Sequence, residues 1–107
     1  MRGPYPLSPL AVDIRVPCRV RGVYCLAKEP GGPVVKVSRA EADIREELKA
    51  SFPEYRAYWY ETCVSSDEVY ATECRLYHKY VGTTSWGKQV HPTAPARANV
   101  KCPVCGQ

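Results

Sequence analysis

The sequence predicts an α+β domain in which helices pack on a small three-stranded antiparallel sheet, in the order β-β-α-β-α. Two short apolar runs flank the turn signal Glu29-Pro30-Gly31-Gly32-Pro33, which indicates a hairpin. Two serines each stand three residues before a glutamate, as in helix capping boxes, and an aromatic-rich run lies between them. Strand-like and helix-like segments in this order are typical of α+β domains.

At 107 residues, the chain has the length of one domain with a single modest core. The proline-rich start predicts an extended N-terminal arm over residues 1–17, before a domain over 18–82. Residues 83–107 predict an irregular, cysteine-containing tail packed on that domain. No apolar run approaches the roughly 18 residues of a membrane span, and the N-terminus lacks the apolar core of a signal peptide. We therefore expect a cytoplasmic monomer without membrane association.

The first strand is expected over Arg19–Ala27, because apolar side chains alternate along it. A glycine inside a strand often marks the close approach of another backbone or a ligand, and Gly22 stands in this one. After the turn, Val34–Val37 predicts a second strand, so that the two strands form a hairpin.

The helix after the hairpin is expected to begin at Ser38, which forms a capping box with Glu41. Apolar residues then recur at every fourth position as far as Phe52, and Pro53 ends the helix. The next run, residues 55–64, is rich in tyrosine and tryptophan and predicts the third strand.

A second capping box, formed by Ser65 and Glu68, predicts the start of another helix. Apolar side chains line one face of this helix as far as Tyr80, and Gly82 is a natural C-terminal stop. Residues 83–101 follow without a clear period.

Taken together, these elements resemble the GIY-YIG nuclease superfamily over about residues 19–80. Gly22-Val23-Tyr24 stands where that family has its first motif, and residues 73–80 look like the glutamate-bearing helix of its short phage-like members. The resemblance implies phosphodiester hydrolysis. In the family, a tyrosine positions water, an arginine stabilises the phosphate charge, and a glutamate holds Mg²⁺ or Mn²⁺.

Carried over residue by residue, the resemblance gives catalytic roles to Tyr24, Arg45 and Glu73. The best register places Glu47 at the arginine position, so Arg45 fits only after a small shift. Lys36 replaces the second tyrosine of the family pattern. We therefore expect a DNA- or RNA-binding domain with weak or absent endonuclease activity. The plainer alternative is that a strand tyrosine packs in the core and a helix glutamate faces solvent.

The basic residues are unevenly distributed along the chain. Residues 1–40 carry seven Lys or Arg against two acids, residues 41–74 carry three against nine, and residues 75–107 carry five against none. Folding of the two basic ends onto one face would favour contact with phosphates, although an acidic helix face can also simply be solvated. The residues expected to contact phosphates flank the first hairpin, where the resembled family binds nucleic acid: Arg19, Arg21, Lys36 and Arg39.

Six cysteines without a signal peptide indicate a reducing compartment, where thiols bind metals or lie buried more often than they form disulfides. Cys102-Pro103-Val104-Cys105-Gly106 is typical of a zinc knuckle. Antiparallel pairing of the first and third strands would place Cys63 near Cys18. The expected structural Zn²⁺ ligands are Cys18, Cys63, Cys102 and Cys105, with His91 as a substitute ligand.

Three alternatives stay open at this point. The chain is also compatible with a zinc-stabilised module that binds a protein partner and catalyses nothing. Cys102 and Cys105 are also compatible with a redox pair, although a redox CxxC normally stands at a helix N-terminus in a thioredoxin-like pattern. Cys18 and Cys63 are also compatible with simple burial.

Overall fold

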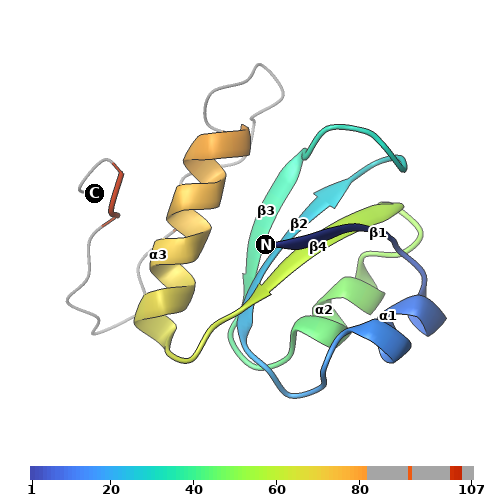
Figure 1. The fold of residues 1–107 in the computed structure, drawn as a ribbon, viewed down its shortest axis with the longest axis horizontal. Coiled ribbons are helices and arrows are strands. Elements are labelled where there is room, and N and C mark those ends of the chain that lie inside the picture. Colours follow the sequence, from blue (N-terminus) through green and yellow to red (C-terminus); the bar gives the residue numbers. More distant parts are fainter. Residues whose placement is uncertain (82–91, 93–101, 105–107) are drawn as a thin grey trace.

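The computed structural model describes residues 1–81, 92 and 102–104 (Figure 1). Its elements are β1 (Arg2–Pro6), α1 (Pro9–Arg15), β2 (Gly22–Ala27), β3 (Lys36–Ala40), α2 (Ile44–Ala50), β4 (Ala57–Thr62), α3 (Ser66–Leu76) and the π-helical turn η1 (Tyr77–Val81). The strands form one antiparallel sheet of four strands in the order β1-β4-β2-β3. The α+β class is therefore confirmed, whereas the prediction of three strands is wrong.

Strand β2 is the centre of the sheet, and all six of its residues are buried. It pairs with β3 on one edge and with β4 on the other, so that Tyr24 lies between Ser38 and Tyr60. At its start, a Cβ on Gly22 would lie 2.1 Å from the carbonyl oxygen of Glu61. The close backbone approach expected at this glycine is therefore confirmed, and a larger residue cannot stand there without displacing β4.

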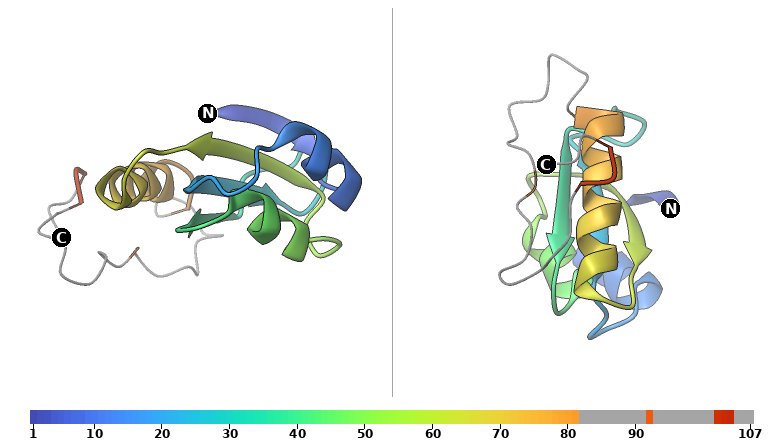
Figure 2. Two further views of the ribbon diagram at one scale, coloured as in Figure 1. Left: turned by 90° about the horizontal axis from the view of Figure 1, so that it is seen from below. Right: turned by 90° about the vertical axis from the view of Figure 1, so that its left-hand side faces the viewer.

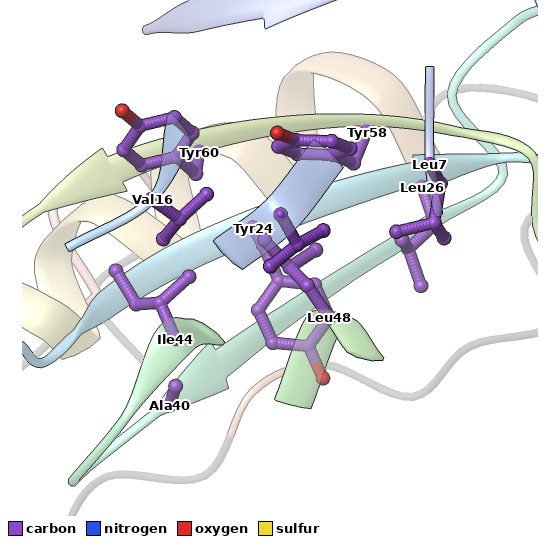
Figure 3. Packing of buried hydrophobic residues seen from close by; sticks show 10 residues of the cluster. Leu7, Val16, Tyr24, Leu26, Ala40, Ile44, Leu48, Tyr58 and Tyr60 are labelled. Carbon is purple, nitrogen blue, oxygen red and sulfur yellow. The ribbon is translucent and has the colours of Figure 1, made fainter. Parts of the chain in front are cut away.

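Helices cover the two faces of the sheet, and each cover buries its own apolar cluster (Figure 2). Helices α1 and α2 pack over one face, and the cluster beneath them is drawn in Figure 3: Leu7, Val12, Val16, Tyr24, Leu26, Ala40, Ile44, Leu48, Tyr58 and Tyr60. Helix α3 and η1 pack against the other face, where the buried residues are Val23, Cys25, Val34, Val37, Cys63 and Val69. Alternation along β2 therefore sends its side chains into two separate cores.

The N-terminal residues belong to the core, so the prediction of an extended arm over 1–17 is wrong. The ring centroid of Tyr5 on β1 lies 5.5 Å from that of Tyr58 and 6.3 Å from that of Tyr60. Contacts among these tilted rings, together with the burial of Leu7 and Val12, hold this proline-rich segment against the sheet instead of leaving it as a separate arm. Because residues before 18 share a core with the strands that follow, the structure does not place a domain boundary at residue 18.

The segment that predicts an arm also contains a helix start signal for α1. Ser8 is the N-cap, and its hydroxyl accepts a hydrogen bond from the Ala11 amide. Pro9 occupies the first helical turn, where its missing N–H costs nothing.

The helix after the hairpin starts later than the sequence predicts. Ser38 is not its N-cap but lies inside β3, because pairing with β2 continues to Ala40. Helix α2 begins only at Ile44, capped by Asp43. The helix starts later because pairing of β3 with β2 satisfies backbone hydrogen-bonding groups along five residues. A capping box at Ser38 would satisfy only the few amides at one helix end.

The second capping box is confirmed. The Ser65 hydroxyl accepts a hydrogen bond from the Glu68 amide at 3.1 Å, and α3 follows. Across the residues that the structure describes, no helix combines the length and apolarity needed to cross a membrane.

Leucine truncations test whether the N-terminal segment is part of the core. Leu7 is 3 % exposed and Leu10 is 72 % exposed, although both lie in the segment expected to be an arm. We expect Leu7→Ala to lower the free energy of unfolding by roughly 2–5 kcal/mol, because it leaves a cavity beside the tyrosines. Leu10→Ala, the matched control, is expected to change it by less than about 0.5 kcal/mol. Urea unfolding followed by tryptophan fluorescence measures both, and equal small effects would contradict the packing of this segment.

Candidate functional site

Tyr24 stands at the centre of the candidate catalytic residues but is held as a neutral phenol. Its hydroxyl donates a hydrogen bond to Oε1 of Glu47 on α2 at 3.2 Å. Burial and, to a smaller extent, the neighbouring Glu47 charge raise the pKa of Tyr24 to about 12, against a hydrogen bond with Ser38 that lowers it. At neutral pH this phenol therefore carries its proton and cannot act as a base.

Arg45 points to a different partner. Its Nε donates a hydrogen bond of 2.8 Å to the carbonyl oxygen of Val16, the C-cap of α1. This contact joins α2 to the end of α1 and occupies the guanidinium there. The residue that contacts Tyr24 is thus Glu47, which the best register with the nuclease family places at the arginine position.

Glu73 lies in an ion pair on the opposite side of the sheet. It is 6 % exposed, and its Oε1 lies 3.5 Å from Nε of Arg39 on β3. Arg39 pairs with Val23, which belongs to the cluster under α3, whereas Tyr24 belongs to the cluster under α1 and α2. The charge of Glu73 makes the smallest of the contributions that raise the pKa of Tyr24. The structure therefore gives Tyr24, Arg45 and Glu73 separate partners.

The four predicted phosphate contacts fall at two ends of the sheet. Arg19 is exposed in a left-handed conformation with φ 58°, just before β2. Arg21 donates a hydrogen bond to Oγ of Ser66 at 3.3 Å, and Arg39 lies at the same end in its ion pair with Glu73. Lys36 alone among the four lies at the other end, where β3 begins.

A group of cations and aromatic rings gathers at that other end, and we call it the Lys28–Tyr55 patch. Lys28 Nζ lies 4.5 Å from the centroid of the Tyr55 ring, and Lys36 Nζ lies 5.8 Å from it. The guanidinium of Arg56 lies 5.7 Å from the centroid of the Phe52 ring. These distances fall within the range of cation–π attraction.

Backbone pairing explains why the patch forms. The amide of Arg56 donates a hydrogen bond of 3.0 Å to the carbonyl of Ala27, which places Arg56 beside Lys28. Leu26 pairs with Lys36 across the hairpin. The sequence does not predict Lys28 and Arg56 as candidate phosphate contacts, because their proximity depends on the register of β2 against β4. The signal available in the sequence is that Lys28 directly follows one apolar run and Arg56 directly precedes the aromatic run of β4.

A small cavity of about 160 Å³ adjoins the patch within the hairpin connection. Its lining residues are Lys28, Glu29, Gly32, Pro33 and Val35. Lys28 thus borders both the cavity and the Tyr55 ring.

The cysteines are distributed differently from the predicted zinc site. Cys18 is exposed, whereas Cys63 is buried with its Sγ 3.8 Å from Oγ1 of Thr72. The expected antiparallel pairing of β4, which ends just before Cys63, with β2, which begins after Cys18, is confirmed. The Cys63 amide donates a hydrogen bond of 2.9 Å to the carbonyl oxygen of Arg21. Cys105 and His91 lie outside the described residues. Within 1–81, 92 and 102–104, no three His, Cys, Asp or Glu side chains gather as a metal site.

Cys102 packs against α3, in a different cluster from Cys63. It forms a buried cluster with Tyr70 and Cys74. Burial and, to a smaller extent, the neighbouring Cys102 raise the pKa of the Cys74 thiol to about 12, against a hydrogen bond with Tyr70 that lowers it. The prediction that Cys25 and Cys74 are buried is confirmed, since both are 0 % exposed.

Comparisons with known proteins do not add a function to this geometry. No family model, curated protein or solved structure matches the chain. The function is therefore inferred from the side chains and their contacts.

Removal of one carboxylate charge tests whether Glu73 has a structural role. Because the ion pair with Arg39 is largely buried and links α3 to β3, we expect Glu73→Gln to lower the free energy of unfolding by about 1–3 kcal/mol. The control Glu54→Gln removes an ion pair with Lys28 whose side chains are more than half exposed, and it should cost less than about 0.5 kcal/mol. Chemical denaturation measures both, and an equal cost for the two variants would contradict the structural role of Glu73.

Proposed function

We propose that this chain is a nucleic-acid-binding domain that does not cleave its ligand, and that the Lys28–Tyr55 patch is the binding surface. One observation carries the proposal. Cations that flank the ends of three strands lie over two aromatic rings at one end of the sheet: Lys28, Lys36 and Arg56 over Tyr55 and Phe52.

The patch combines the two kinds of group that bind unpaired nucleic acid. Cationic side chains neutralise phosphates and release condensed counterions, which makes the binding dependent on salt. Aromatic rings stack on bases whatever their sequence, because every base has a π face. Lys28 and Arg56 are exposed, so their charges are accessible to a phosphate backbone. The arrangement therefore fits a single-stranded ligand better than the edge of a duplex groove.

The acidic residues at this end do not cancel the patch. Glu54 lies 3.5 Å from Lys28, but both side chains are more than half exposed, so the pair is weak and exchangeable. Glu29 lines the cavity and is exposed. Neither carboxylate contacts Lys36 or Arg56 through an ion pair among the described residues.

The same proposal explains why binding would occur without hydrolysis. A phosphoryl-transfer site needs positive charge directed at the phosphate and a group that delivers water. The hydroxyl of Tyr24 instead donates a hydrogen bond to Glu47, and Nε of Arg45 donates one to the carbonyl oxygen of Val16 at the end of α1. Glu73 is compensated by Arg39 rather than left open for a divalent ion. A relationship to the GIY-YIG nucleases, as a non-catalytic branch, is part of this proposal and is supported by the central position of Gly22-Val23-Tyr24.

Neutralising the patch tests the binding surface. We expect the double variant Lys28→Ala/Arg56→Ala to weaken binding of a labelled single-stranded oligonucleotide. It should also lower the slope of log K against log salt by about 1.4, because each lost phosphate contact removes roughly 0.7. Fluorescence anisotropy at several salt concentrations measures both quantities, with DNA and RNA probes compared.

The matched control removes the same charge from the opposite end of the sheet. Arg19→Ala/Arg21→Ala should leave the salt slope unchanged, because neither residue lies in the patch. If this control loses the slope while the patch variant keeps it, the sequence-predicted face binds and the proposed surface is wrong.

The absence of hydrolysis is tested separately, with Mg²⁺ or Mn²⁺ and both single- and double-stranded substrates. We expect no cleavage that depends on the metal, and identical traces from the native protein, Tyr24→Phe and Glu73→Gln. Gel analysis of end-labelled DNA and RNA reports the result. Metal-dependent cleavage by the native protein that disappears in Tyr24→Phe would show that the chemistry survives.

A further inference from the structure

A pair of buried thiols on the outer side of α3 has no part in the proposed binding function. Cys74 is 0 % exposed and Cys102 is 2 % exposed, and they cluster with Tyr70. In Figures 1 and 2, residues 102–104, drawn in red, run beside α3 on the side away from the sheet. Two thiols that are distant in the sequence therefore meet where the C-terminal residues contact this helix.

The two thiols contact each other directly. The Cys74 thiol hydrogen-bonds with the thiol of Cys102 and with the hydroxyl of Tyr70. The Tyr70 contact lowers the pKa of Cys74, as a hydrogen bond donated to the sulfur does, because such a bond stabilises the thiolate. The sequence pairs Cys102 with Cys105, which lies outside the described residues, whereas the structure gives Cys102 a neighbouring thiol on α3.

Another pair of buried thiols shows that a shared cluster does not by itself allow a disulfide. Cys25 and Cys63 both belong to the cluster between α3 and the sheet. Cys25 pairs with Trp59, whereas the Cys63 amide donates to the carbonyl oxygen of Arg21, which precedes Cys25 along the same extended segment. At about 3.3 Å per residue, the two backbones lie roughly 13 Å apart, well beyond the 7 Å or so between Cα atoms that a disulfide spans.

We propose that Cys74 and Cys102 are a redox-active pair, which a low-molecular-weight disulfide oxidises to a reversible disulfide that cross-links the C-terminal residues to α3. The Cys102 thiolate attacks one sulfur of the small disulfide, its S–S bond breaks, and one small thiolate leaves. The Cys74 thiolate then attacks the Cys102 sulfur of this mixed disulfide, and the second small thiolate leaves. The two cysteines together lose two protons and two electrons, and the small disulfide becomes two small thiols.

The order of the two steps follows from the surroundings of each thiol. Cys102 is followed by Pro103 and Val104, which are both exposed, so the segment that carries it borders the solvent. Cys74 lies within α3, and burial keeps it protonated, so it is the thiol that acts second. In a reducing compartment such a disulfide forms only transiently, when the small-molecule disulfide accumulates.

The cross-link and the fold stabilise each other. A disulfide between Cys74 and Cys102 closes a loop and so restricts the unfolded chain. By the same thermodynamic cycle, a fold that holds the two thiols in contact favours the disulfide by an equal factor. The effective concentration of one thiol at the other is therefore a direct measure of whether the native structure brings them together.

Redox titration of the full-length protein measures this effective concentration. The protein is equilibrated with mixtures of reduced and oxidised glutathione, in buffer and in concentrated urea, and the reaction is stopped with acid. Mass spectrometry then gives the fraction of chains that hold a Cys74–Cys102 disulfide. We expect the effective concentration to be at least about tenfold higher in buffer than in urea, because only the folded chain holds the thiols in contact.

Tryptic peptides identify the two cysteines that are joined. Cleavage after Arg56, Arg75 and Lys101 gives the peptides 57–75 and 102–107, which hold two cysteines each. In the native protein, fragmentation of the linked peptides locates the cross-linked cysteine in each, and this result does not depend on the folding of a variant. We expect the link to join Cys74 to Cys102.

A variant pair provides the matched control. In Cys63→Ala/Cys105→Ser, each of the two peptides holds a single thiol, so any link between them joins Cys74 to Cys102. We expect this variant to form the link as the native protein does, and the same variant with Cys74→Ser added to lose it.

Three results would overturn the proposal. Equal effective concentrations in buffer and in urea would show that the fold does not bring the two thiols together. A disulfide confined to the peptide 102–107 of the native protein would assign the redox chemistry to Cys102 with Cys105. A link through Cys63 or Cys105 would assign it to another pair. Because Cys74 and Cys102 take no part in the Lys28–Tyr55 patch, each of these results leaves the test of nucleic-acid binding unaffected.

Discussion

Pairing of β2 along both of its edges is the constraint on which the rest of this structure depends. Its six residues are all buried, and each has hydrogen-bonded neighbours in β3 or β4. A strand that is enclosed in this way must be apolar on both faces, and Gly22 must lack a side chain because β4 passes so close. The separation into two apolar cores follows from the alternation of its side chains.

The same pairing decides which charged residues meet. At the far end of β2, the ladder brings Lys28, Lys36 and Arg56 together over aromatic rings. At the near end, it sets Arg39 against Glu73. At the far end, the ion pair of Lys28 with Glu54 is exposed and weak, whereas at the near end the ion pair of Arg39 with Glu73 is largely buried. This difference is why the proposed binding surface lies away from the residues that resemble a nuclease site.

Helix α3 separates two environments for sulfur. Its inner side faces the sheet, where Cys63 contacts Thr72 in an apolar cluster. Its outer side carries Cys74, which Cys102 covers.

The sequence by itself determined the α+β class, the hairpin, the capping of α3 by Ser65 and the close approach at Gly22, because each depends on neighbouring residues or on a simple period. The tertiary structure alone decided the fourth strand, the start of α2 and the partners of the charged residues. Aromatic packing ordered a proline-rich segment as β1, and the ladder kept Ser38 in a strand. Lys28 with Arg56, and Cys74 with Cys102, are distant in the sequence, and their proximity depends on strand register and on docking against a helix, which no local pattern encodes.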